Sequence, residues 1–233
     1  MLGQYFAGMR TLYHWPLDPD SRQTRLALGE KKLKFKLIPV VPWTPTEDFL
    51  NLCVEGVPPC LVEDTDGGKT IISTARAICE YVADDGNTRT ALLPDSAILR
   101  AEARRICHWF DVKFSGDVNA YILSERLEKA GFGGAPDPSV LRIGREHLKF
   151  HLEYMSWLLE SRDWLACNQM SLADLSAGAH ISCLDYLDEI RWDKWPGLKD
   201  WYQKLKSRPC FRPLLKDTLP GLRPPRHYTD LDF

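Results

Sequence analysis

The segment LYHWPLDPDSRQTRLAL at residues 12–28 carries the clearest chemical signal in the chain. Leu12–Trp15 suits a short buried strand, two prolines set a turn, and Ser21 is placed to cap a following helix. Asp18 occupies the turn itself. An ionised carboxylate accepts hydrogen bonds but donates none, and it repels a thiolate by about 4 kcal/mol at ~4 Å and an effective dielectric constant of ~20. Asp18 is therefore unsuited to stabilise an anionic sulfur at this turn.

Other side chains with catalytic potential are better explained by structural roles. Ser21 is expected to cap a helix, and Tyr13 is expected to pack from its strand. His147 and His151 share a helix face at i, i+4, as a metal pair would, but no HExxH pattern or third ligand accompanies them. The sequence has neither a GxSxG nucleophile motif nor a phosphate-binding glycine loop. We therefore expect no resident metal and no cofactor.

Charge and composition exclude several classes of protein. The formal net charge of −2 argues against a nucleic-acid-binding protein, which normally carries a basic excess. No apolar run approaches the ~20 residues that a membrane helix needs, so we do not expect a membrane-integral protein. The seven scattered cysteines include no CxxC pair, which indicates reduced and mostly buried thiols. Together with the lack of a long apolar segment near the N-terminus, this favours a cytoplasmic protein.

Strand and helix signals alternate along the first 88 residues. The segment DTDGG reads as the turn of a hairpin. The order βαβ and then ββα predicts a thioredoxin-like domain over residues 1–88. Its strands are expected at Leu12–Trp15, Phe35–Val41, Gly56–Glu63 and Lys69–Ser73, and its helices at Ser21–Glu30 and Thr74–Ala83.

Beyond a turn-rich linker at residues 84–94 the chain reads as helical, which predicts an all-α domain over residues 89–218. Ser171 and Asp174 form an N-capping box, in which the Ser hydroxyl and the Asp carboxylate each accept from a backbone N–H of the helix start. Residues 219–233 are predicted to form an extended, proline-containing C-terminal tail. The expected helices are Asp95–Phe114, Ser139–Glu160, Ser171–Asp188 and Gly197–Ser207.

Several of these segments resemble the cytosolic glutathione transferases. That family opens with LYxxPxSPxS or LYxxPxCPxS before a helix of the form RxxRLAL, and it carries an S/T-x-A-D box later in the chain. The segment WPGLKDWYQKLKSRPCFRPLLK at residues 195–216 is similar to its final helix. The matches run in the family's order over residues 11–217. The resemblance implies a thioredoxin-like α/β domain followed by an all-α domain. It also places Asp18 where the family has the Ser or Cys that acts on sulfur, so no catalytic residue is expected.

The same resemblance implies a degenerate glutathione site. In the family a Val-Pro pair with a cis proline contacts the cysteinyl part of glutathione, and Val57–Pro58 is its counterpart here. A Glu/Gln–Ser pair grips the γ-glutamyl arm, but Thr74 and Ala75 stand at those two positions. Hydrogen bonds to charged groups contribute ~1.5–3 kcal/mol each, so losing two would weaken binding by about 10²–10⁴. We therefore expect a protein without transferase activity.

The C-terminal residues LPGLRPPRHYTDLDF combine a proline-rich spacer with alternating apolar and acidic groups. This end either docks in a groove of another protein or folds back on its own helices. We expect partner recognition rather than a contribution to stability. Trp43, which lies between two prolines, is either an exposed anchor or a lid on the core. The candidate partner-binding residues are Trp43, Tyr228, Asp230, Leu231, Asp232 and Phe233.

The opening segment, the strand VEGVPPCLVE and the terminal HYTDLDF further resemble a family of alphaproteobacterial division proteins built on the transferase fold. The resemblance implies a homodimer, recruited to the division site, that binds filaments of the tubulin homologue FtsZ and favours their curved form during constriction. It also implies that the tail contacts another division protein, such as FtsK. The alternative is a divergent transferase or lyase that uses glutathione with an atypical residue near Asp18.

Overall fold

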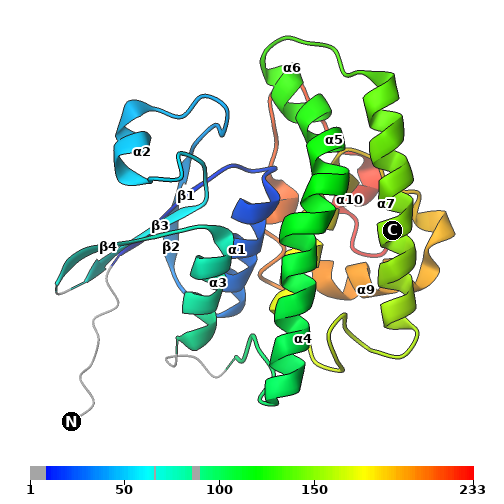
Figure 1. Cartoon of the computed structure of the whole chain (residues 1–233), viewed down its shortest axis with the longest axis horizontal. Coiled ribbons are helices and arrows are strands. Elements are labelled where there is room, and N and C mark those ends of the chain that lie inside the picture. The colour runs from blue at the N-terminus through cyan, green and yellow to red at the C-terminus, as the bar shows by residue number, and fades with distance from the viewer. Residues whose placement is uncertain (1–8, 66, 86–89) are drawn as a thin grey trace.

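The computed structural model describes residues 9–65, 67–85 and 90–233. A four-stranded mixed sheet in the order β2-β1-β3-β4 forms the N-terminal domain (Figure 1). β1 (Arg10–His14) runs parallel to β2 (Phe35–Pro39) and antiparallel to β3 (Cys60–Thr65). β4 (Gly68–Ser73) completes the hairpin with β3. The four strands follow one another along the chain as predicted, although Asp66 in the predicted turn lies outside the described residues.

Three helices accompany the sheet. α1 (Pro19–Glu30) and α3 (Ala75–Asp84) lie between the sheet and the helical domain (Figure 1). α2 (Glu47–Leu52) was not predicted, because six residues are too short to show a helical period. It supplies Phe49 to a small second core. β3 begins later than predicted, since Pro58 and Pro59 have no N–H for a strand ladder.

One long helical rod opens the C-terminal domain, running from Ala97 to Gly131. The prediction that this helix ends at Phe114 is wrong. Its middle is π-helical, with i→i+5 bonding, so the apolar positions depart from the 3.6-residue period that sequence reasoning searches for. Buried residues recur there at intervals of four, at Phe110, Phe114, Val118 and Ile122. The parts of the rod are α4 (Ala97–His108), η1 (Trp109–Asn119), α5 (Ala120–Leu123), η2 (Ser124–Glu128) and α6 (Lys129–Gly131).

The later helices lie close to their predicted ranges. α8 (Leu172–Tyr186) is buried along its whole length, and the predicted capping box is confirmed, with the Ser171 N–H donating to Asp174 Oδ2 at 2.9 Å. Asp174 Oδ1 also accepts from the Trp201 indole at 3.0 Å. The remaining elements are α7 (Pro138–Leu159), η3 (Trp192–Lys194), α9 (Pro196–Lys206), η4 (Leu214–Lys216) and α10 (Arg226–Thr229).

A single main core joins the two domains, because α1 packs directly on α8. Arg22 crosses this contact with no exposed surface. Its Nε donates to the carbonyl of Pro16 and its Nη1 donates to Ser182 Oγ, both at 2.7 Å. Asp217 Oδ2 lies 3.5 Å from Nη2, and the Tyr228 ring centroid lies 5.9 Å from the guanidinium carbon. One side chain thus connects α1, α8 and the C-terminal segment.

Two further findings bear on the predicted organisation. All seven cysteines are free thiols, and all but Cys167 are buried. Within the described ranges, no helix has the length and apolar character that a membrane crossing requires. The predicted domain boundary between residues 88 and 89 falls outside the described residues, so it stays a prediction.

Candidate functional site

Asp18 is the N-cap of α1. Its Oδ2 accepts from the backbone N–H of Ser21 at 2.7 Å and from the Ser21 hydroxyl at 2.6 Å. The prediction that Ser21 caps this helix is therefore wrong, because the helix begins two residues earlier, at Pro19. Ser21 Oγ instead accepts from the Trp15 N–H at 3.0 Å, which ties the turn to the end of β1. Since the hydroxyl is committed to Asp18 and Trp15, it is poorly placed to replace a missing sulfur-activating group.

The electrostatics of Asp18 reinforce this assignment. Removal from water raises the pKa of Asp18 to about 6, although the hydrogen bonds from Ser21 oppose the shift. At neutral pH the carboxylate is mainly ionised, and it accepts bonds from the helix start. Tyr13 packs against Phe49 of the small second core, with ring centroids 5.6 Å apart. The turn is thus built as a helix cap.

The cis peptide bond just before β3 lies between Pro58 and Pro59, not between Val57 and Pro58 as predicted. The residue before the cis proline is consequently Pro58, which has no backbone N–H to donate to a peptide-like ligand. Val57 is half exposed, and its carbonyl accepts from Cys53 Sγ at 3.7 Å. A backbone donor that the family resemblance implies is therefore missing from this position.

Thr74 and Ala75 stand at the N-terminus of α3, as the resemblance predicts. Thr74 is the N-cap, with φ at 66°, and its hydroxyl accepts from the Ala77 N–H at 3.4 Å. Ala75 is buried and offers no polar group. Helix N-termini favour anions, but here the capping hydroxyl already occupies one of the free amides. The next residue, Arg76, turns away to pair with Asp111 of the helical domain.

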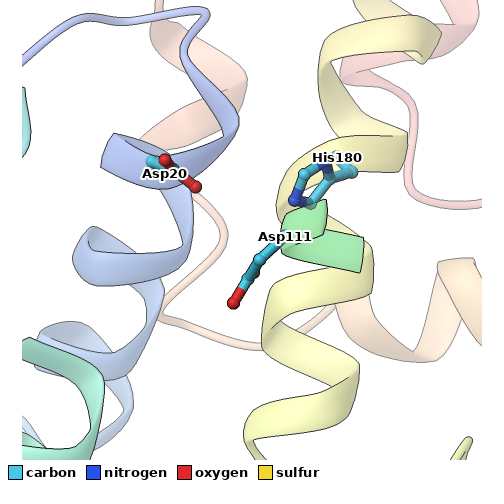
Figure 2. A group of neighbouring side chains, drawn as sticks. All are labelled: Asp20, Asp111 and His180. Atoms are coloured by element: carbon cyan, nitrogen blue, oxygen red, sulfur yellow. The ribbon is translucent and has the colours of Figure 1, made fainter. Parts of the chain in front are cut away.

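Asp111 belongs to a polar cluster between the domains that the sequence did not reveal. Asp20 on α1, Asp111 on η1 and His180 on α8 each place one ligand-type atom within 4.8 Å of the others (Figure 2). Desolvation, together with the carboxylates of Asp18 and Asp111, raises the pKa of Asp20 to about 7. Burial lowers the pKa of His180 to about 4, so its ring is neutral. Three separate elements contribute these residues, so no local spacing could have indicated them.

The two histidines considered as a metal pair instead contact residues of η1. His147 Nδ1 lies 2.8 Å from the backbone oxygen of Asp117, and His151 Nε2 lies 3.0 Å from its carboxylate. His151 is fully buried against Trp109, with ring centroids 4.7 Å apart. Both rings thus fasten α7 to η1.

Trp43 lines a cavity of about 510 Å³ between the two domains. Its ring meets Trp15 edge-on, with centroids 5.7 Å apart. It also lies so close to Gly131 that a Cβ there would sit 2.9 Å from the indole. Phe132 and the segment Leu219–Leu222 form other walls of the cavity. Trp43 therefore lies at the domain junction and is half-buried, so it is not the fully exposed anchor that was one of the two alternatives.

The C-terminal residues fold back on the helical domain. Tyr228 is completely buried, and its hydroxyl donates to the carbonyl of Leu214 at 3.0 Å. Phe233 packs on Trp192, with ring centroids 5.3 Å apart, and Lys206 Nζ lies 4.1 Å from the Phe233 centroid. The expectation of an extended tail without a structural role is therefore wrong for these residues. Tyr228 cannot meet a partner in this state, because its side chain belongs to the core.

Acidic groups remain on the outside of this folded segment. Asp230 and Asp232 are exposed, and Leu231 is partly buried. Lys206 Nζ donates to the backbone oxygens of His227 at 3.1 Å and Asp230 at 2.7 Å. These two bonds hold the C-terminal segment on α9. The predicted partner-binding residues thus divide into an internal set and an acidic surface set.

Comparison with known proteins agrees with this geometry. The N-terminal domain of glutathione S-transferase matches residues 19–85, and its C-terminal domain matches residues 141–216. FtsZ-localized protein A of Caulobacter vibrioides is 50% identical over 225 residues, which are 96% of this chain and 98% of that protein. Glutathione S-transferase 3 of Zea mays is 29% identical and covers 86% of this chain and 90% of its own length.

Solved structures extend the likeness to three dimensions. FzlA from C. crescentus superposes with a TM-score of 0.94 at 49% identity, covering 97% of this chain and 100% of that one. A glutathione S-transferase from Rhodospirillum rubrum superposes with a TM-score of 0.90 at 42% identity, again covering 97% and 100%. The predicted thioredoxin-like α/β domain with an all-α domain is confirmed. The chain therefore belongs to the glutathione S-transferase family, in the group of relatives that includes FtsZ-localized protein A.

Proposed function

We propose that this chain is a non-catalytic, transferase-like protein of cell division that binds FtsZ filaments at the division site, in the cytoplasm. The observation that carries the proposal is the match to FtsZ-localized protein A, which extends over almost the full length of both chains. The proposal includes regulation of filament curvature during constriction. Its ligand is thus a protein filament rather than a small molecule.

The degenerate ligand site supports a role without catalysis. Asp18 is committed to capping α1, and Thr74 is committed to capping α3. Ala75 brings no polar group, and Pro58 brings no backbone donor. Each position lacks a group that the family resemblance implies for holding glutathione or its sulfur. A scaffold that has lost these groups can still present surfaces to other proteins.

A homodimer is part of the proposal. An apolar face on α7 supports it, because Trp157 and Phe150 are 59% and 56% exposed and lie two helical turns apart on that helix. Tyr154 joins them by stacking on Trp157 with ring centroids 5.9 Å apart. Exposed apolar groups gathered in this way are typical of protein contacts. We assign this face to a second copy of the chain, since isologous dimers are the commonest oligomers.

The dimer is tested by light scattering. A mass of about 53 kDa, twice the 26.7 kDa chain, is expected at micromolar protein. Trp157→Glu should shift the mass to that of a monomer, whereas Lys204→Glu, at an exposed position of α9, should not. A monomeric wild-type chain would contradict the dimer.

We further propose that the acidic surface of the C-terminal segment contacts a second division protein, such as FtsK. Asp230 and Asp232 favour a basic partner surface, and charges of this kind steer association. Asp230→Lys should weaken that contact without affecting FtsZ binding. If FtsZ binding falls equally, the acidic surface serves the filament instead.

Co-pelleting with polymerised FtsZ is the experiment that tests the main proposal. The chain should appear in the pellet with FtsZ and GTP, and should stay in the supernatant when GTP is omitted. Electron microscopy of the same samples should show more strongly curved filaments. If the chain stays in the supernatant with intact filaments, the proposal fails.

A divergent glutathione-dependent transferase or lyase is the second candidate. The cavity of about 510 Å³ favours it, because a substrate-sized space lies beside Trp15 and Trp43 at the domain junction. Retention on glutathione-agarose and turnover of a chloro-dinitrobenzene substrate would support this activity. Absence of both, together with co-pelleting, would favour the filament-binding role.

A further inference from the structure

The interdomain cluster of Asp20, Asp111 and His180 has the composition of a metal-binding site. Its three potential ligand atoms lie within 4.8 Å of one another (Figure 2). Asp20 comes from α1 of the N-terminal domain, whereas Asp111 and His180 come from η1 and α8 of the helical domain. An ion held here would bind both domains at once.

His180 provides evidence independent of the acidic pair. Its side chain is completely buried, and within the described part of the chain its Nε2 has no hydrogen-bond partner. The other ring nitrogen, Nδ1, lies 2.8 Å from the Asn119 side-chain amide. The Asn119 side-chain oxygen is likewise buried with no partner among the described residues. With the Asn119 amide turned over, that oxygen accepts the Nδ1 proton and Nε2 presents its lone pair toward the carboxylates.

Neighbouring groups already hold the carboxylates in place. Gln23 Nε2 lies 3.2 Å from Asp20 Oδ1 and 3.3 Å from Asp111 Oδ1, so it bridges the two domains' acids. Ser176 Oγ donates to Asp111 Oδ1 at 3.3 Å. Hydrogen-bonded groups of this kind orient the ligands around protein metal ions.

The charge balance also favours a cation. Arg76 pairs with Asp111 and neutralises one carboxylate. Asp20 and the nearby Asp18 carry further negative charge when ionised, and neutral His180 adds none. A divalent cation would relieve the repulsion between these acids.

We propose that Asp20, Asp111 and His180 bind a divalent first-row transition-metal ion such as Zn²⁺ at the domain junction. One imidazole and two carboxylates form a suitable donor set, and three protein ligands leave a further position for water. Because bonds to Zn²⁺ are ~2.0–2.2 Å long and arranged as a tetrahedron, ligand atoms on one ion lie roughly 3.4 Å apart. Side-chain rotations that bring the three ligand atoms closer together than in this structure therefore complete the site. The ion would act by holding α1 against α8.

Cobalt absorption spectroscopy tests this proposal directly. Co²⁺ is titrated into chelator-treated, dialysed full-length protein, and thermal unfolding is followed in parallel. One equivalent per chain should bind with a visible d–d band, raise the melting temperature and be displaced by Zn²⁺. The spectrum should lack a sulfur-to-cobalt charge-transfer band, because none of the three ligands is a thiolate.

Asp20→Asn is the deciding variant, because Asp20 makes no ion pair among the described residues and the amide preserves its shape. Affinity for Co²⁺ should fall at least ~10-fold. His147→Gln is the matched control, since it removes a histidine outside the cluster and should leave binding unchanged. Circular dichroism of each variant verifies the fold. Unchanged binding in Asp20→Asn, a thiolate band, or no binding at ~1 mM Co²⁺ would each overturn the proposal.

Discussion

Replacing Tyr228 with alanine should destabilise the protein strongly, in contrast to what its place near the C-terminus suggests. The ring is completely buried, and it meets Tyr186 edge-on with centroids 5.1 Å apart. Its hydroxyl donates to the Leu214 carbonyl, and the Arg22 guanidinium lies 5.9 Å from the ring centroid. The substitution therefore opens a cavity and removes contacts from a buried charge.

The magnitude follows from these contacts. Truncating a buried aromatic side chain to alanine costs about 3–5 kcal/mol in the free energy of unfolding. For a chain of this size each kcal/mol lowers the melting temperature by ~2–4 °C. Tyr228→Ala should thus lower it by roughly 6 °C or more. Tyr228→Phe keeps the ring but removes the hydrogen bond to Leu214, so about 1 kcal/mol should be lost.

Differential scanning calorimetry and urea titration provide the measurement. Asp232→Ala is the matched control, because Asp232 is exposed in the same segment and its side chain should contribute no more than ~0.5 kcal/mol. If Tyr228→Ala melts within ~2 °C of the wild type, the segment is not docked in solution and the reasoning fails.

Two further predictions concern binding and pH. Calorimetry of the wild-type chain should detect no glutathione binding with a dissociation constant below ~1 mM. The combined Asp18→Ser, Thr74→Glu and Ala75→Ser variant should bind glutathione more tightly than the wild type. If the variant gains no affinity, these positions do not form the site. The hydrogen bond to Asp185 raises the pKa of His227 above 6.5, although partial burial opposes the shift. The folded state therefore holds the His227 proton more tightly, so the stabilisation is complete below pH ~6.5 and is lost as pH rises through the raised pKa. The difference in melting temperature between wild type and His227→Gln should thus shrink between about pH 6 and pH 9, and a constant difference would contradict this assignment.

Local signals in the sequence were sufficient for much of the fold. Two examples are the capping box at Ser171 and Asp174 and the amphipathic helix α9. Both depend on residues three or four positions apart, so their patterns can be recognised within one short stretch of sequence. The turn at Asp18 was located correctly, but its cap was assigned to Ser21. Both residue types cap helices, and the choice depends on whether Pro19 begins the helix, as proline readily does.

Long-range contacts account for what the sequence did not reveal. The burial of Tyr228 depends on Leu214 and Arg22, which lie 14 and 206 positions away along the chain. The cluster of Asp20, Asp111 and His180 likewise depends on the packing of α1 against the helical domain. Neither arrangement produces a periodic pattern in the sequence, because each contributing element supplies only one or two residues.

Arg22 makes docking of the C-terminal segment and the contact between the domains thermodynamically interdependent. The same guanidinium bonds Ser182 on α8 and faces Tyr228 of that segment. Releasing the C-terminal segment exposes one side of the Arg22 guanidinium to solvent, which weakens the packing of α1 on α8. By linkage, a ligand that binds only the released segment would lower the affinity of any molecule that requires the closed junction, by the same factor in both directions.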